Sequence, residues 1–328
     1  MTKPHTTRRS SNQLYSLNQC ALYKVNSKRR LAQILGVDLA LLRKLSRDEG
    51  SYNVFEIPEE ICSFTGKKTK ARLVQNPVPE LKAVHKRIHA LLSRVCMPDF
   101  CHGSVKGRSY RSNAAAHVTQ PVVATFDLKS FFPSTLAYQV FGFYRNELQC
   151  SPDVAGLLTD LCTYRKMLPT GSPVSPVLSF WANRNLFNTL NKRAQEQHLK
   201  LSVYVDDITV SGQNISNSLS SQFAGIVSKH GHGLAHEKTK VFAEEDVKHV
   251  TGIAIKNGKL RVPYSRFKKA RAIRQAINES LDDIEKEKLI AKLCGLLGEA
   301  AFIDKSFKTW ADQAYESLAQ IKRKRTPS

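Results

Sequence analysis

The apolar and polar positions of the chain predict a mixture of strands and helices. In residues 201–212 the two kinds alternate up to an Asp-Asp pair, which is typical of a half-buried strand that turns at the acids. A continuous apolar run, residues 122–126, predicts a second strand that ends at Asp127. Between these strands the pattern predicts helices around residues 136–166 and 177–197.

The N-terminal part predicts further helices and one hairpin. Residues 14–47 have helical periodicity that is interrupted at Gly36, which is compatible with a DNA-binding helix-turn-helix or with two packed helices, and we favour the packed helices. Residues 52–57 and 71–75 predict a hairpin around a basic tip. An amphipathic helix is expected over residues 79–95.

Positive charge is concentrated toward the two ends of the chain. The formal net charge is +22, with 14 basic against 6 acidic side chains in residues 1–72 and 17 against 9 in residues 256–328. Such a surplus favours binding to nucleic-acid phosphates, although an ordinary solvated basic surface has the same composition. Residues 1–12 are polar and are expected to be disordered, and residues 256–328 have a helical pattern.

Three acidic residues at strand ends are the strongest candidates for chemistry. Asp206 and Asp207 are adjacent, and two carboxylates repel each other by about 4 kcal/mol at 4 Å with an effective dielectric near 20. Asp127 ends the other apolar strand, where an unpaired carboxylate is costly. An Asp-Asp pair alone also occurs in ordinary turns. Together, however, the three acids predict a site for two Mg²⁺ ions that catalyses phosphoryl transfer.

A rigid loop lies between the two acidic strands. In residues 168–176 (LPTGSPVSP) three prolines surround Gly171, so that the backbone could approach a ligand closely before a helix begins. Taken alone, this segment could equally be an ordinary loop that caps a helix.

The order of these segments resembles that of a reverse transcriptase. Asp127 with Phe132, the loop around Gly171, the sequence YVDD at residues 204–207 and Lys238-Thr239 match four successive motifs of that family. Within the family the chain resembles the bacterial retron enzymes, because residues 113–117 (NAAAH) fit their NAxxH motif and residues 250–252 fit their VTG motif. The chain departs from the usual pattern in having Thr170 in place of Gln, Val205 in place of Ala and Ala235 in place of Asn.

The resemblance implies an α+β protein with the right-hand polymerase fold. It implies an N-terminal helical extension in residues 1–50, fingers in residues 51–115, a palm with an antiparallel sheet and inserted helices in residues 116–255, and a helical thumb in residues 256–328. The implied metal ligands for two Mg²⁺ are Asp127, Asp206, Asp207 and Leu128. The implied nucleotide-binding residues are Arg72, Phe132, Thr170, Gly171 and Lys238. The implied RNA-binding residues are Asn113, His117, Val250, Thr251, Gly252, Arg266, Lys268, Lys269 and Arg271.

Two of these residues have specific implied roles. Arg72 would meet the phosphates of the incoming nucleotide, which need a cation besides the metals. Phe132, five positions after Asp127, would exclude nucleotides with a ribose 2′-hydroxyl, although a buried core aromatic is the alternative.

The retron resemblance also implies the partners. These are dNTPs, a cognate structured non-coding RNA that is both template and primer, its branched RNA–DNA product (msDNA) begun from a guanosine 2′-hydroxyl, and a separate effector protein of toxin, nuclease or ATPase type used in anti-phage defence.

No segment has the roughly 18–20 uninterrupted apolar residues of a membrane span, and we expect a cytoplasmic protein without a membrane partner. The seven cysteines are scattered and predict neither disulfides nor a zinc site. Two alternatives stay open: a reverse transcriptase of another bacterial lineage, group II intron-like or of the abortive-infection type, and a non-catalytic helix-turn-helix protein that binds nucleic acid.

Overall fold

The predicted acidic strands lie side by side in a four-stranded antiparallel sheet. The computed structural model describes residues 14–47, 50–66 and 68–325, so the disorder expected for residues 1–12 lies outside the described residues. The strand order is β6-β7-β5-β8. The bounds are Val122–Asp127 for β5, Lys200–Tyr204 for β6, Asp207–Gly212 for β7 and Lys240–Phe242 for β8.

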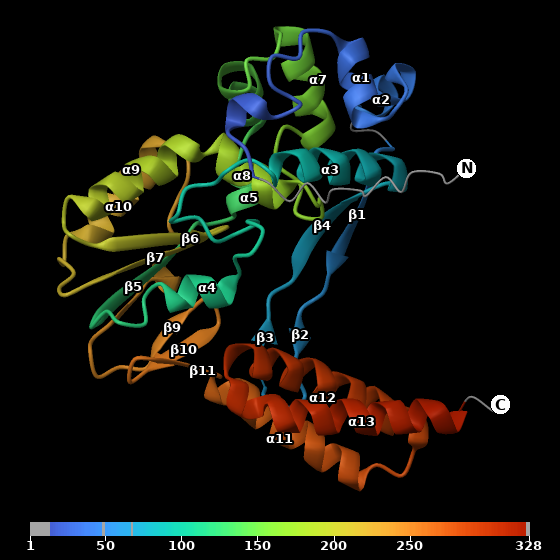
Figure 1. Cartoon of the computed structure of the whole chain (residues 1–328), viewed down its shortest axis with the longest axis vertical. Helices are drawn as coiled ribbons and strands as arrows, with labels where there is room; N and C mark the ends of the chain where they lie inside the picture. The colour runs from blue at the N-terminus through green and yellow to red at the C-terminus, as the bar shows by residue number, and fades with distance from the viewer. Residues whose placement is uncertain (1–13, 48–49, 67, 326–328) are drawn as a thin grey trace, which may run out of the picture.

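Both faces of this sheet are covered, which explains its apolar sequence. Helices α9 (Arg184–Gln195) and α10 (Leu219–Lys229) lie over one face (Figure 1), and the ring of Phe126 packs against that of Phe223 with their centroids 5.2 Å apart. On the other face, Val123 packs with residues of α4 (Tyr110–Ala115) and of a second sheet. A strand that is buried on both sides needs apolar residues at nearly every position.

The second sheet has three short strands in the order β11-β10-β9. Their bounds are Lys248–Val250 for β9, Ile253–Lys256 for β10 and Lys259–Arg261 for β11. The boundary predicted between residues 255 and 256 therefore falls within one hydrogen-bonded unit, since β10 pairs with both of its neighbours.

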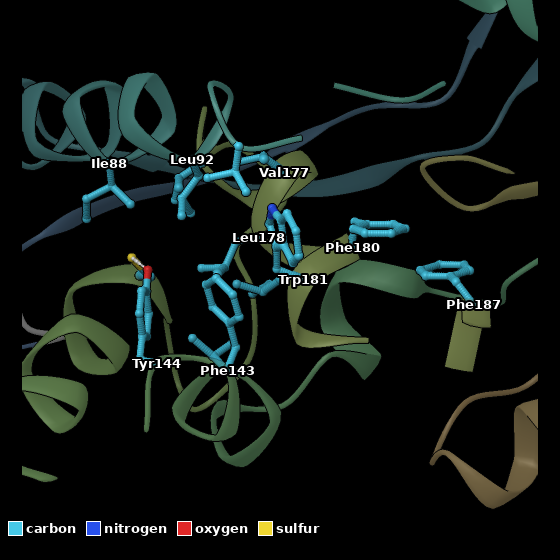
Figure 2. Close-up of a cluster of buried hydrophobic side chains, with 14 of the residues drawn as sticks. Ile88, Leu92, Phe143, Tyr144, Val177, Leu178, Phe180, Trp181 and Phe187 are labelled. Atoms are coloured by element: carbon cyan, nitrogen blue, oxygen red, sulfur yellow. Dashed lines mark hydrogen bonds between the residues drawn. The ribbon is translucent and has the colours of Figure 1, made fainter. Parts of the chain in front are cut away.

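A helical core holds the loop around Gly171 in place. Helix α8 (Ser175–Ala182) follows that loop and packs against α3 (Pro79–Leu92), as Figure 2 shows for Val177, Leu178 and Leu92. Each large apolar side chain buried here contributes about 1.5–3 kcal/mol. The remaining helices of this region are α5 (Phe131–Ser134), α6 (Ala137–Gly142), the π-helical segment η2 (Phe143–Glu147) and α7 (Pro152–Cys162).

The N-terminal helices are shorter than predicted. Only α1 (Lys28–Leu35) and α2 (Leu39–Leu45) are α-helical, so the helix expected from residue 14 was wrong up to residue 27. Only a short 3-10 helix, η1 (Leu17–Gln19), forms there, and tertiary hydrogen bonds lie on both sides of it: Tyr15 N donates to Arg94 O (3.0 Å) and Lys24 N donates to Leu148 O (2.8 Å). Buried leucines pack α1 and α2 against α3 and α7, as expected for two packed helices.

The predicted hairpin is present and extends into a long ribbon. Strand β1 (Tyr52–Ile57) pairs with β4 (Arg72–Pro77), and beyond them β2 (Glu60–Ile61) pairs with β3 (Lys68–Thr69). Figure 1 shows the ribbon reaching from α3 to the helices near the C-terminus.

The far end of the ribbon, residues 60–66, contacts the C-terminal helices, and we call it the tip. Phe64 packs against the apolar core of these helices, and a cavity of about 390 Å³ between the two parts is lined by Cys62 and Lys269, among others. The helices are α11 (Tyr264–Glu279), α12 (Asp283–Ile303) and α13 (Lys308–Arg325). None of the helices in the described part of the chain is both long enough and apolar enough to cross a membrane.

Candidate active site

Three carboxylates meet at one end of the four-stranded sheet. Asp127 is the last residue of β5 and lies directly opposite Asp207, the first residue of β7. Asp206 belongs to the turn before β7, and its carbonyl oxygen accepts a hydrogen bond from Leu128 N (3.0 Å). The antiparallel register therefore brings together acids that are about eighty positions apart in the sequence.

The turn that carries Asp206 is conformationally strained. Only Val205 and Asp206 separate β6 from β7, and Val205 has a φ of 61°. A positive φ is unusual for a β-branched residue and costs on the order of 1–3 kcal/mol. Packing elsewhere must hold this conformation in place, because an isolated Val would leave it.

Burial and mutual repulsion disfavour the charged form of the acids. Burial, followed by the charges of Asp206 and Asp127, raises the pKa of Asp207 to about 7. Burial also raises the pKa of Asp206, whereas the nearby Lys238 opposes the rise. A bound cation would remove this penalty, since opposite charge stabilises a carboxylate.

Lys238 supplies one positive charge at the site. It ends the short helix η3 (His236–Lys238), and its Nζ lies 2.9 Å from both carboxylate oxygens of Asp127. The hydrogen bond to Asp127 raises the pKa of Lys238, so the side chain is a cation at neutral pH. The lysine thus neutralises one of the three acids.

The donor set fits a divalent metal ion, although its geometry differs from that of a loaded site. Among the described residues, no group of three or more His, Cys, Asp or Glu side chains already has the arrangement of a metal site. Asp127 binds Lys238 instead. The residues nevertheless fit Mg²⁺, because carboxylate oxygens are its preferred ligands and Asp207 is destabilised as an anion without a cation.

A cavity of about 480 Å³ opens beside the acids. It brings together most of the residues that the sequence predicted for metal and nucleotide binding. They are Arg72, Asp127, Leu128, Phe132, Thr170, Asp206 and Lys238. Phe132 is half-buried at the wall, whereas its neighbour Phe131 is 4% exposed and packs against Phe187.

The loop around Gly171 forms the wall of this cavity next to strand β4. Thr170 N donates to Gln75 Oε1 (2.9 Å), and Thr170 Oγ1 lies 2.8 Å from Leu73 O. A Cβ on Gly171 would lie 2.5 Å from Gln75 O, closer than real Cβ atoms approach, so only glycine fits between the loop and the ribbon. The strand that carries Arg72 is thereby fixed relative to the carboxylates.

A family comparison agrees with this arrangement. The sequence profile described as "Reverse transcriptase (RNA-dependent DNA polymerase)" matches residues 65–255, more than half of the chain and the segment that contains all three acids. The chain belongs to the reverse transcriptase family. This family implies the right-hand polymerase fold, and the mixture of helices and antiparallel sheets agrees with the predicted α+β class.

Several curated relatives of this chain are retron enzymes. Retron Se72 reverse transcriptase of Salmonella heidelberg is 30% identical over 245 residues, which are 70% of this chain and 61% of the relative. Retron Ec86 reverse transcriptase of Escherichia coli is 25% identical over 262 residues, 79% of this chain and 80% of the relative. Retron Mx65 reverse transcriptase of Myxococcus xanthus is 28% identical over 250 residues, 69% of this chain and 57% of the relative. These similarities confirm the predicted resemblance to bacterial retron reverse transcriptases.

Two residues that the sequence predicts to contact RNA lie in the interior of this reverse transcriptase. His117 is fully buried, and its ring nitrogens lie 2.6 Å from Ser211 Oγ and 2.7 Å from Ser202 Oγ. Asn113 is also fully buried and belongs to helix α4, which ends at Ala115, before His117. The burial of both side chains favours a structural role for them, because neither is open to RNA in this conformation.

The VTG residues form a tight turn between β9 and β10. Val250 is buried, and the Thr251 hydroxyl donates to Tyr110 O (3.0 Å). Gly252 has a φ of 76° and lies beside the guanidinium group of Arg266. Arg266 itself forms an ion pair with Glu299 (2.6 Å).

The other predicted RNA-binding cations lie on helix α11. Lys268 and Arg271 are exposed, whereas Lys269 lines the cavity under the tip. Lys268 and Arg271 are therefore the two that face solvent, and RNA binding by these residues stays a prediction.

Sequence reasoning missed several residues at the site. Gln75 fixes Thr170, and Ser130, with a φ of 49°, lines the cavity between Asp127 and Phe132. The pairing of Lys238 with Asp127 was also missed, although both residues were singled out. Gln75 lies three positions after Arg72 on strand β4, but no feature of the sequence distinguishes a single Gln that contacts a distant loop.

The raised pKa of Asp207 predicts a pH-dependent gain in stability for Asp207→Asn. The pKa of this carboxyl group is about 3.9 in the unfolded chain and about 7 in the folded protein. Its contribution to the free energy of unfolding is therefore fully present below about pH 3.9 and is lost as the pH rises toward about 7. Without metal, the variant should therefore gain thermal stability relative to wild type more at about pH 8 than at about pH 5. Thermal unfolding in EDTA at both pH values measures this, and an equal difference at both would contradict it.

Burial of His117 predicts a loss of stability for His117→Ala. The change removes two hydrogen bonds, leaves two buried serine hydroxyls unpaired and opens a cavity, at a cost of about 2–4 kcal/mol. DNA synthesis should fall equally on the cognate RNA and on a generic primed RNA. Thermal unfolding and the two assays measure this, with the exposed His249→Ala as control. A selective loss on the cognate RNA at unchanged stability would instead support RNA recognition by His117.

Proposed function

We propose that this protein is an RNA-directed DNA polymerase of the retron type. It copies part of a cognate structured non-coding RNA, begins from a guanosine 2′-hydroxyl and makes branched RNA–DNA (msDNA). The observation that carries the polymerase activity is the cavity of about 480 Å³ that Asp127, Asp206, Arg72 and Lys238 line together, with Asp207 paired opposite Asp127 in the sheet beside it. The retron type rests on the names of the relatives.

The acids would hold two Mg²⁺ ions. Asp127, Asp206 and Asp207, with Leu128 beside them, are the ligands, and bound Mg²⁺ would help the primer hydroxyl to attack and would neutralise charge on the phosphates. Before the acids can bind Mg²⁺, two of the side chains described above must change their state. Asp207 must lose the proton that burial favours, and Lys238 must leave Asp127.

The released Lys238 and Arg72 would bind the triphosphate of a dNTP. Both line the cavity, and phosphate oxygens are strong acceptors for charged donors. Phe132 would lie against the sugar and exclude a 2′-hydroxyl. Thr170 and Gly171 would support the base, because the loop is fixed to β4 through Gln75.

The right hand would be divided as the resemblance implies, with fingers in residues 51–115, a palm in residues 116–255 and a thumb in residues 256–328, except that the pairing of β10 with β11 moves the end of the palm to residue 261. The exposed Lys268 and Arg271 on α11 would contact RNA phosphates, and such contacts weaken as salt concentration rises. A separate effector protein and a role in anti-phage defence complete the proposal, and they rest on the retron resemblance alone.

Two measurements on the purified protein test this function. Primer extension on an RNA template with dNTPs and Mg²⁺ tests polymerisation, and sequencing of copurified nucleic acid tests the retron type. A branched RNA–DNA molecule with a 2′ linkage supports the proposal. Extension without a branched product indicates another reverse transcriptase lineage, and copurified RNA without extension indicates a non-catalytic binding protein.

A further inference from the structure

The segment that precedes helix α4 runs beside the strand that leads into the acidic turn. Val203 N donates to Phe100 O (2.8 Å), and His102 N donates to Val203 O (2.7 Å). These bonds form a parallel bridge between Cys101 and Val203 at the edge of the four-stranded sheet. Two residues further along each of the two paired segments, the same register brings Gly103 next to Val205.

Gly103 touches the backbone of the strained turn. A Cβ at this position would lie 2.6 Å from Val205 N, 2.9 Å from Val205 Cγ2 and 3.2 Å from Tyr204 C. The first distance is shorter than real Cβ atoms show, and it is to a backbone atom that cannot rotate away. Glycine is therefore the only residue that allows the segment to pack against Val205 without moving the turn.

Arg108 binds the backbone of the residues just before Gly103. Its Nη1 lies 2.7 Å from Pro98 O, 3.1 Å from Asp99 O and 2.6 Å from Cys101 O. Its Nη2 donates to the exposed carboxylate of Asp99 (3.0 Å). One guanidinium group thus binds the carbonyl oxygens of Pro98, Asp99 and Cys101, in the turn that leads to Gly103, and a single ammonium group cannot reproduce this set of bonds.

We propose that Gly103 and Arg108 are positioning residues for the carboxylates. Gly103 packs against Val205 and maintains its left-handed conformation, which sets the direction of Asp206 and Asp207, and Arg108 holds Gly103 in place. This inference rests on the proposed polymerase function for its kinetic consequences. Its structural part, the arrangement of a metal-binding pair of acids, is independent of polymerisation.

The test compares Gly103→Ala with Gly225→Ala. Gly225 lies in the exposed part of helix α10, where a Cβ meets no atom within 4 Å, so this control adds the same methyl group without a clash. The measurements are the affinity for Mn²⁺ by electron paramagnetic resonance without RNA or nucleotide, kcat and KM for dNTP incorporation, the affinity for RNA, and the thermal midpoint. A second variant, Arg108→Lys, keeps the charge but loses the fork of donors.

Gly103→Ala is expected to bind Mn²⁺ about tenfold more weakly and to lose about tenfold in kcat, as is typical when the support of a metal ligand is changed. The KM for dNTP and the affinity for RNA should stay within about twofold of wild type, and Arg108→Lys should act in the same direction.

The inference would be overturned if Gly103→Ala had the Mn²⁺ affinity and the kcat of wild type. The inference would also be wrong if Gly103→Ala had a lower thermal midpoint and a smaller active fraction but the folded enzyme still bound Mn²⁺ with wild-type affinity. If wild type binds Mn²⁺ but polymerises nothing, a weaker affinity in Gly103→Ala supports the positioning role while the proposed function fails.

Discussion

An enzyme with both Asp206→Asn and Asp207→Asn is expected to make no DNA while it still folds and binds RNA. The amides keep the volume of the acids but cannot balance the charge of two Mg²⁺ ions. Loss of metal catalysis is worth several kcal/mol, or a rate decrease of about 1000-fold or more. Primer extension with Mg²⁺ as the sole metal measures the loss.

The folding of the double variant can be tested separately from its activity. Because burial raises the pKa of both acids, their neutral replacements should not destabilise the metal-free protein. RNA affinity and the thermal midpoint in EDTA should therefore match or exceed those of wild type. Normal dNTP incorporation by the double variant would rule out the two-metal assignment.

Phe132→Ala is expected to change sugar selection rather than stability. The half-buried ring lines the cavity near Asp127, so its removal opens space where a ribose 2′-hydroxyl would lie. The ratio of rNTP to dNTP incorporation should rise on the order of 100-fold, the usual discrimination of one steric contact in a pocket. Single-nucleotide incorporation with matched rNTP and dNTP measures the ratio.

The adjacent Phe131 provides a matched control. Phe131 borders the same cavity, but its ring is 4% exposed and packs against Phe187 and His232, so Phe131→Leu should lower the thermal midpoint and change the ratio much less than Phe132→Ala does. An unchanged ratio in an active Phe132→Ala enzyme would show that Phe132 is only a core residue.

The sequence predicted the strands and the acids because their pattern is local. The acidic strands and the hairpin of residues 52–57 and 71–75 each have a continuous apolar or alternating run, and the structure has strands there. In residues 15–24 helical periodicity was misleading, since only a short 3-10 helix forms and hydrogen bonds to residues 94 and 148 hold the rest of the segment. Local propensity cannot predict such long-range bonds.

The site was predictable in its residue types but not in its contacts. The carboxylates, Arg72, Phe132 and Lys238 were singled out, and one cavity gathers most of them. Three contacts depend on how distant segments pack: the binding of Asp127 by Lys238, the burial of His117 between two serines, and the approach of Gly103 to Val205. Each joins residues 85 or more positions apart, a separation at which periodicity carries no information.

The contact between the tip and the C-terminal helices has a mechanical consequence. Phe64 packs on those helices, and Ile303 of α12 packs with residues of the second sheet, so the C-terminal helices are joined to the rest of the protein at two separate places. A unit that is held at two places cannot turn about the chain connection alone. Any movement of these helices away from the ribbon must first break the apolar contact of Phe64, so this contact limits how far and how often the helices move.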